Sequence, residues 1–121
     1  MRGASALESL LETRTDSHLR VFVIWEPVLA TDLTPPSTIT LRRIHDPRAK
    51  QYWDSNRVLS HVMGEHDRPS VVCDYIVVYK PEQIWTVAPP QPQFNGRPVV
   101  RFIDGTRKAL ETMYSEQNKL N

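Results

Sequence analysis

Two long apolar stretches, rich in β-branched and aromatic residues, constrain the fold of this chain more than any other feature. The first covers residues 19–25 and the second residues 71–79. Such residues favour strands, and a nearly unbroken apolar strand is typical of a sheet that is covered on both faces. The segment between them is long enough for a crossover connection. The pattern therefore predicts a β-sheet with residues 19–25 in its middle and helices packed against it.

Shorter patterns complete the predicted sheet. Residues 49–53 predict a strand parallel to residues 19–25, which would be the central strand. Residues 84–87 predict the second arm of a hairpin with residues 71–79, and the latter would also lie antiparallel to the central strand. Together these segments predict an α/β fold with a four-stranded mixed β-sheet flanked by helices.

Helices are expected at both ends of the chain. Ser5 and Glu8 have the spacing of a capping box, which predicts an N-terminal helix and loop over residues 1–18. Residues 104–117 place four apolar side chains on one helical face, which predicts a C-terminal helix. Four prolines within residues 88–98 predict an extended proline-rich loop between the hairpin and that helix.

One short helix is favoured over a strand after Ser37, which is a suitable N-cap, and Pro47 would end it. Residues 58–63 predict another short helix that ends at Gly64.

Size and charge limit the classes of function. A chain of 121 residues with 40% apolar residues fits one domain over residues 1–121. A formal charge of +1 provides no attraction to nucleic acid or to an anionic membrane, so neither is an expected partner. No apolar run is long enough for a secretory signal or a membrane span, which favours a cytoplasmic location. One basic cluster is expected to be a solvated face: Arg42, Arg43, Arg48 and Lys50.

Three stretches resemble proteins of the thioredoxin-like superfamily. Residues 21–25 look like the first core strand of thioredoxins, which ends in a tryptophan. Residues 52–58 are similar to the Tyr-Asp-Pro-Asp-Gly-Arg-Val stretch of redoxin-type members, and residues 75–84 resemble the hairpin that follows their cis-proline. The chain also looks like a bacterial thioredoxin-like group of uncharacterised function with Trp-x-Pro, Tyr-Trp-Asp and Asp-Tyr in this order. The resemblance covers residues 19–87 and implies a thioredoxin-like fold.

The sequence departs from this family where its chemistry occurs. Glu26 and Leu29 stand at the positions of the two thiols of the Cys-x-x-Cys motif, and the cis-proline site falls near Cys73. Disulfide exchange needs a thiolate of low pKa and a second, resolving thiol. Cys73 is the one cysteine of the chain. We therefore expect a redox-inactive binding or accessory module.

An enzyme is the alternative, and two groups of residues are candidates for it. Cys73 is the catalytic candidate for a one-cysteine thiol enzyme, although a cysteine in an apolar strand usually serves as a small buried hydrophobe. His61, Glu65 and His66 have the residue types of a zinc site. Their spacing differs from the known zinc-binding helices, and surface histidines are the plainer interpretation.

Three further residues, His18, His45 and Asp46, would contribute to such a metal site only if the fold brought them close. The chain has no glycine-rich nucleotide loop, so no cofactor is expected.

The expected binding residues are Trp25, Glu26 and Pro27, because ligands of open α/β sheets collect beyond the carboxyl ends of the strands. Thioredoxins hold their substrates there, and the resemblance implies a strand-end groove for a protein or peptide partner. Trp25 would supply apolar area and Glu26 a charge for an extended peptide or a cationic group. The alternative is a packed Trp25 and a solvated Glu26. The sequence leaves the partner's identity and the oligomeric state open.

Overall fold

The computed structural model describes residues 2–28, 34–64 and 71–120. The chain divides into two compact units, Met1–Cys73 and Asp74–Asn121. Both helices and strands are present, as the sequence predicts. In chain order they are α1 (Arg2–Glu12), β1 (Val21–Trp25), α2 (Thr38–Leu41), β2 (Ala49–Trp53), α3 (Val58–Val62), β3 (Ile76–Val78), β4 (Phe94–Gly96) and α4 (Val99–Leu120). Within these residues, no helix is both long and apolar enough to cross a bilayer.

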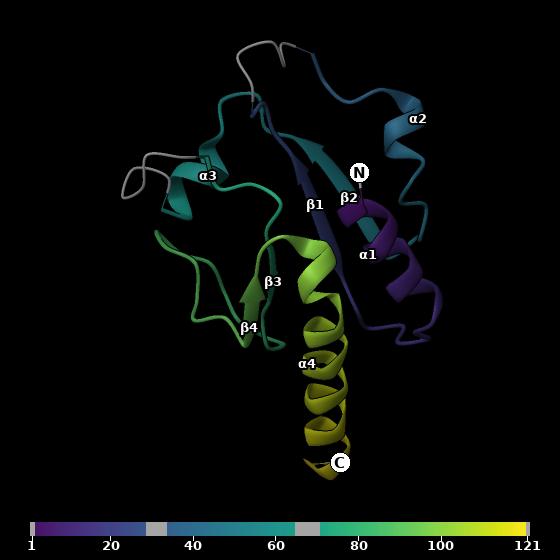
Figure 1. Cartoon of the computed structure of the whole chain (residues 1–121). Helices are drawn as coiled ribbons and strands as arrows, with labels where there is room; N and C mark the ends of the chain where they lie inside the picture. The colour runs from purple at the N-terminus through teal and green to yellow at the C-terminus, as the bar shows by residue number, and fades with distance from the viewer. Residues whose placement is uncertain (1, 29–33, 65–70, 121) are drawn as a thin grey trace. The chain divides into compact units, whose positions relative to one another are not determined.

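The first unit contains a parallel pair of strands, β1 and β2 (Figure 1). Their register runs from Val21 opposite Ala49 to Trp25 opposite Trp53, which confirms the predicted parallel pairing. The short helix α2 lies in the connection between them. Its N-cap is Ser37, whose hydroxyl accepts a hydrogen bond from the Thr40 N–H at 3.3 Å, as its position in the sequence predicts.

The predicted four-stranded mixed sheet is wrong. The described residues form two separate sheets of two strands each, β1 with β2 and β3 with β4. β3 covers Ile76–Val78 instead of residues 71–79, and its antiparallel partner is Phe94–Gly96 instead of residues 84–87. Because β1 pairs with β2 alone, it is not the centre of a larger sheet. The thioredoxin-like core is therefore absent from the described residues.

Packing on α4 explains why β4, and not residues 84–87, pairs with β3. The side chain of Phe94 in β4 lies against Phe102 of α4, with ring centroids 6.2 Å apart. Two glycines permit this close approach, because a Cβ on Gly96 would overlap the Phe102 ring and one on Gly105 would overlap the Phe94 ring. Val87 has no such packing and is 98% exposed. Burial of aromatic area thus favours the later segment.

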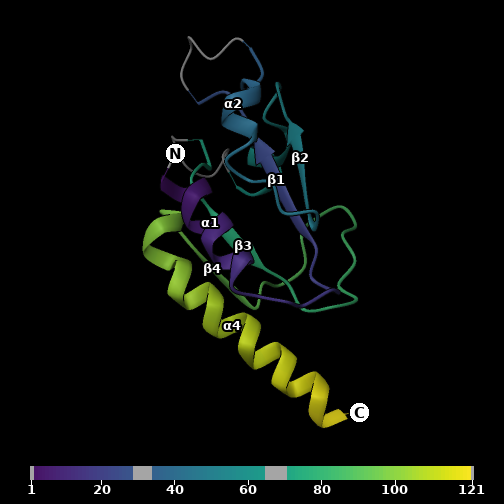
Figure 2. The same ribbon diagram turned by 90° about the vertical axis from the view of Figure 1, so that its right-hand side faces the viewer.

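The helix α4 packs against β3 and β4 (Figure 2) and is longer than the predicted 104–117. Its first N–H group, that of Val99, donates to the Asp74 carboxylate at 3.1 Å. Asp74 adopts a left-handed backbone conformation with φ +48°. A cap supplied from 25 residues upstream has no local sequence signal, so the sequence could not place the start of this helix.

At the N-terminus, α1 extends through the predicted capping box, so Ser5 lies inside the helix and Glu8 does not cap it. The Glu8 side chain instead accepts hydrogen bonds from the backbone N–H groups of His45 at 3.0 Å and Asp46 at 3.1 Å. Glu8 is buried, as are the next apolar residues of the helix, Leu10 and Leu11. This carboxylate therefore ties α1 to the segment between α2 and β2.

Arg48 connects the same parts of the first unit. Its guanidinium donates to the backbone carbonyls of Leu11 at 2.7 Å and Asp16 at 3.1 Å. It also forms a two-pronged ion pair with Asp46, at 2.9 and 2.8 Å. Both side chains are largely buried, so the predicted solvated basic face is wrong for Arg48. The other three basic residues of that cluster are exposed.

The ion pair also changes the acidity of Asp46. The side-chain hydrogen bond from Arg48 lowers the pKa of Asp46 from 3.8 to about 2. Asp46 is therefore ionised at every ordinary pH, and the pair stays charged.

Candidate functional site

The two faces of the β1–β2 pair have different surroundings. On one face, the side chain of Gln51 donates from Nε2 to the carbonyl oxygens of Leu41 and Ile44, each at 2.9 Å. Its Oε1 accepts a hydrogen bond from the Trp25 indole N–H at 2.8 Å. These bonds join the end of α2 to both strands, so this face is covered by the chain itself.

The opposite face carries an exposed pair of aromatic side chains. Phe22 and Tyr52 are stacked, with ring centroids 6.4 Å apart and planes 29° apart. Their exposed fractions are 63% and 48%, unusually high for aromatic residues in strands. The register places Lys50, also exposed, directly opposite Phe22, and Tyr52 opposite Ile24. We call these four residues the aromatic face.

The outer edges of these strands are a second feature of the aromatic face. Within the described ranges, β1 and β2 each pair with a single strand. A strand edge presents backbone N–H and C=O groups in a row that an added strand is able to bind. The aromatic face and two strand edges without a further strand partner among the described residues thus belong to the same two-stranded sheet.

The predicted strand-end residues lie at the carboxyl end of β1. Trp25, Glu26 and Pro27 are all half-buried. Trp25 belongs to the covered face through its hydrogen bond to Gln51, because side chains alternate along a strand and Phe22 lies on the other face. Trp25 therefore has a structural contact, and a role for the three residues in binding stays a prediction.

The hydrogen bonds of Gln51 are expected to contribute measurably to the free energy of unfolding. Gln51→Leu removes the acceptor of the Trp25 N–H and the donor to the Leu41 and Ile44 carbonyls, of which that of Leu41 keeps the Ile44 N–H at 3.2 Å. We expect the free energy of unfolding in urea to fall by about 2 kcal/mol, with a change in tryptophan emission, because buried polar groups lose their hydrogen bonds. The exposed Gln91→Leu is the control and should differ little from the parent. Equal losses in both variants would contradict this role.

Cys73 is a free, half-buried cysteine at the end of the first unit. It lies outside the strands, because β3 begins at Ile76, so its predicted place within a strand is wrong. The preceding residue, Val72, is fixed by a hydrogen bond from its N–H to the buried hydroxyl of Ser60 at 2.9 Å. Catalysis by Cys73 stays a prediction.

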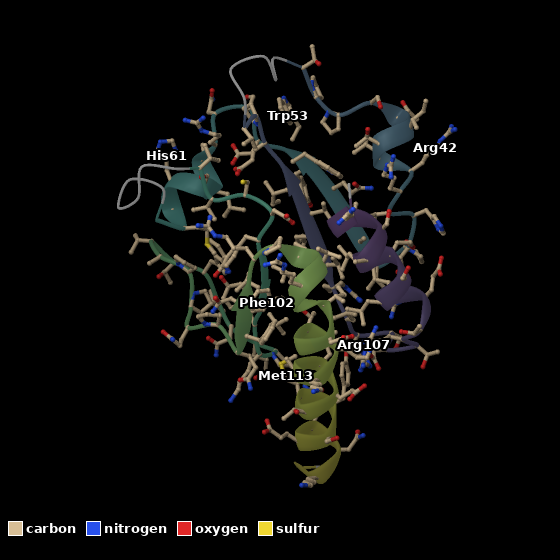
Figure 3. The ribbon with its side chains drawn as sticks, in the orientation of Figure 1. Arg42, Trp53, His61, Phe102, Arg107 and Met113 are labelled. Atoms are coloured by element: carbon tan, nitrogen blue, oxygen red, sulfur yellow. The ribbon has the colours of Figure 1, made fainter. Side chains whose placement is uncertain are left out.

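The predicted metal cluster is only partly described. His61 lies on α3 and is exposed (Figure 3), and its Nδ1 is 2.6 Å from the Arg57 carbonyl oxygen. Because a carbonyl only accepts hydrogen bonds, Nδ1 carries the proton in this contact. Glu65 and His66 lie outside the described residues, so the cluster stays a prediction.

No protein-family model, curated protein or solved structure matches the chain. The resemblance to redoxins thus has no relative to support it, and the arrangement of the strands contradicts its fold. Sequence reasoning missed Phe22 and Tyr52 as surface residues, although Lys50, two positions before Tyr52, signals a solvent-facing side of β2.

Proposed function

We propose that this chain is a non-catalytic binding module that accepts an extended, apolar segment of a partner protein on the β1–β2 sheet. The observation that carries the proposal is the stacked, exposed pair of Phe22 and Tyr52. Exposed aromatic pairs are favourable in an interface, because burying one such ring contributes about 1.5 to 3 kcal/mol.

The sheet favours an extended partner over a helical one. A partner strand added at an unpaired edge gains main-chain hydrogen bonds, and its alternate side chains contact the face of the sheet. Phe22 and Tyr52 would contact apolar side chains of the partner. Lys50 would favour an acidic residue in the partner, because it is exposed opposite Phe22.

The strand-end residues extend this proposal. Glu26 and Pro27 follow β1 without a break, so a segment that runs along β1 would reach them. Glu26 would then supply a negative charge for a basic residue at the end of the partner segment. The proposal thus keeps the peptide partner that the sequence suggested and assigns its main contact to the aromatic face.

A display selection tests the proposal. The full chain is used to select binders from a library of random peptides. We expect the selected peptides to be rich in β-branched and aromatic residues. The double variant Phe22→Ser with Tyr52→Ser should bind them at least about tenfold more weakly, because it lacks the two rings that the peptide would cover. The matched control removes exposed apolar side chains elsewhere, with Ile84→Ser and Val87→Ser. Circular dichroism confirms that both variants are folded.

Two results would contradict the proposal. One is that the Phe22 and Tyr52 variant binds every selected peptide as tightly as the parent. The other is that the control variant alone loses binding, which would place the surface on residues 84–87. Glu26→Lys tests the strand-end contact separately, since it should weaken only peptides with a basic terminal residue.

A further inference from the structure

A group of three metal-ligand side chains lies on α1 and the segment after α2. Glu8, Glu12 and His45 each offer one ligand atom, and these atoms all lie within 4.8 Å of one another. Glu8 and Glu12 are four residues apart on α1, which places both carboxylates on one side of the helix. All three residues belong to the unit Met1–Cys73.

Glu8 is the fixed member of this group. The residue is only 7% exposed. Two backbone N–H groups, those of His45 and Asp46, donate to Oε1 and hold the carboxylate in one orientation. The other oxygen, Oε2, is buried and has no hydrogen-bond partner. A buried carboxylate oxygen without a partner is unfavourable, and a bound cation would compensate it.

His45 lies where it would share such a cation. Its Nε2 is 3.8 Å from Glu8 Oε2, which is too long for a hydrogen bond. Ligand bonds to zinc are about 2.1 Å for histidine nitrogen and carboxylate oxygen, so tetrahedral ligand atoms lie about 3.4 Å apart. The observed separation is close to this value. The side chain of His45 is 69% exposed, and Glu12 is also exposed, so both have room to close around an ion.

We propose that Glu8, Glu12 and His45 bind a divalent transition-metal ion, for which Zn²⁺ is the probe. Two carboxylates and one imidazole are ligands that zinc accepts in proteins. The backbone hydrogen bonds to Glu8 Oε1 orient the ligand before the ion arrives, as outer contacts do in known metal sites. Three protein ligands leave a position for water on the exposed side.

Calorimetry tests the site on the full, untagged chain after treatment with a chelator and its removal. We expect ZnCl₂ to bind with one-to-one stoichiometry and to raise the unfolding temperature, since the ion binds the folded state. Glu12→Gln and His45→Gln should each weaken zinc binding by about 100-fold. Both residues are exposed, so the variants are expected to fold, and thermal unfolding without zinc confirms this. MgCl₂ should produce no binding.

The controls separate this site from the other histidine cluster. His61→Gln and Glu111→Gln change exposed residues outside the proposed site, and both variants should bind zinc like the parent. Absence of one-to-one zinc binding in the parent would overturn the proposal. Zinc binding that is lost in His61→Gln and retained in His45→Gln would equally overturn it.

Discussion

Replacing Arg48 with methionine is expected to lower the free energy of unfolding by about 3 kcal/mol. The substitution keeps most of the apolar volume of the side chain but leaves the largely buried carboxylate of Asp46 without its ion pair. It also removes the donors to the Leu11 and Asp16 carbonyls. Breaking a buried pair by removing one partner is more harmful than replacing both, because the remaining charge stays desolvated.

Urea unfolding measures this effect, and Arg42→Met is the matched control. Arg42 is exposed, so its replacement should change the free energy of unfolding by less than about 0.5 kcal/mol. Arg48→Lys should recover little, because an ammonium group does not reproduce the two-pronged contact. Equal stabilities of the Arg48 and Arg42 variants would show that the ion pair contributes nothing.

The ion pair between Arg48 and Asp46 also predicts how the stability of the folded chain depends on pH. The pKa of Asp46 is lowered from 3.8 to about 2 in the folded chain. A group with a lowered folded-state pKa contributes stability above its unfolded value, and this contribution disappears as the pH falls through the folded value. Stability contributed by Asp46 should thus be complete above pH 3.8 and decrease toward pH 2. Arg48→Met should remove this part of the acid dependence.

Gly96→Val is expected to destabilise the second unit by about 3 kcal/mol, at the upper end of the usual effect of overpacking. A Cβ at this position would overlap the ring of Phe102, so the ring or the helix must move. Asn95→Val is the control, because Asn95 is exposed on the same strand and valine favours strands. Urea unfolding should show a loss for Gly96→Val alone.

A double-mutant cycle identifies the cause. If the ring of Phe102 is the obstacle, Gly96→Val should be much less harmful in a chain that already carries Phe102→Ala. Additive effects of the two substitutions would indicate that the valine is harmful for another reason.

The parallel pairing of β1 and β2 was predictable because its determinants are local. The β-branched and aromatic run in β1, the N-cap Ser37 and the length of the connection all lie in the sequence itself. The partner of β3 was not predictable in this way. Asn95 and Gly96 have low strand propensity, and their pairing depends on Phe94 reaching α4, a tertiary contact that propensity does not encode.

The candidate sites show the same division between local and distant causes. Glu8 has the spacing of a capping box, yet its carboxylate binds backbone groups 37 and 38 residues away. Phe22 was predicted to be buried because the residues around it in the sequence are apolar. In the structure it is exposed, and β2 places Lys50 beside it on the same side of the sheet. Sequence patterns therefore locate the elements of this chain better than the surroundings of their side chains.

The cap of α4 by Asp74 makes the contact between two distant segments of the chain observable at a single amide. Most N–H groups of a helix donate to carbonyls four residues earlier, so their hydrogen bonds need only the helix itself. The Val99 N–H instead depends on a carboxylate 25 positions upstream. Its hydrogen exchange therefore reports opening of the contact between residues 74 and 99, whereas the amides in the middle of α4 report opening of the helix itself.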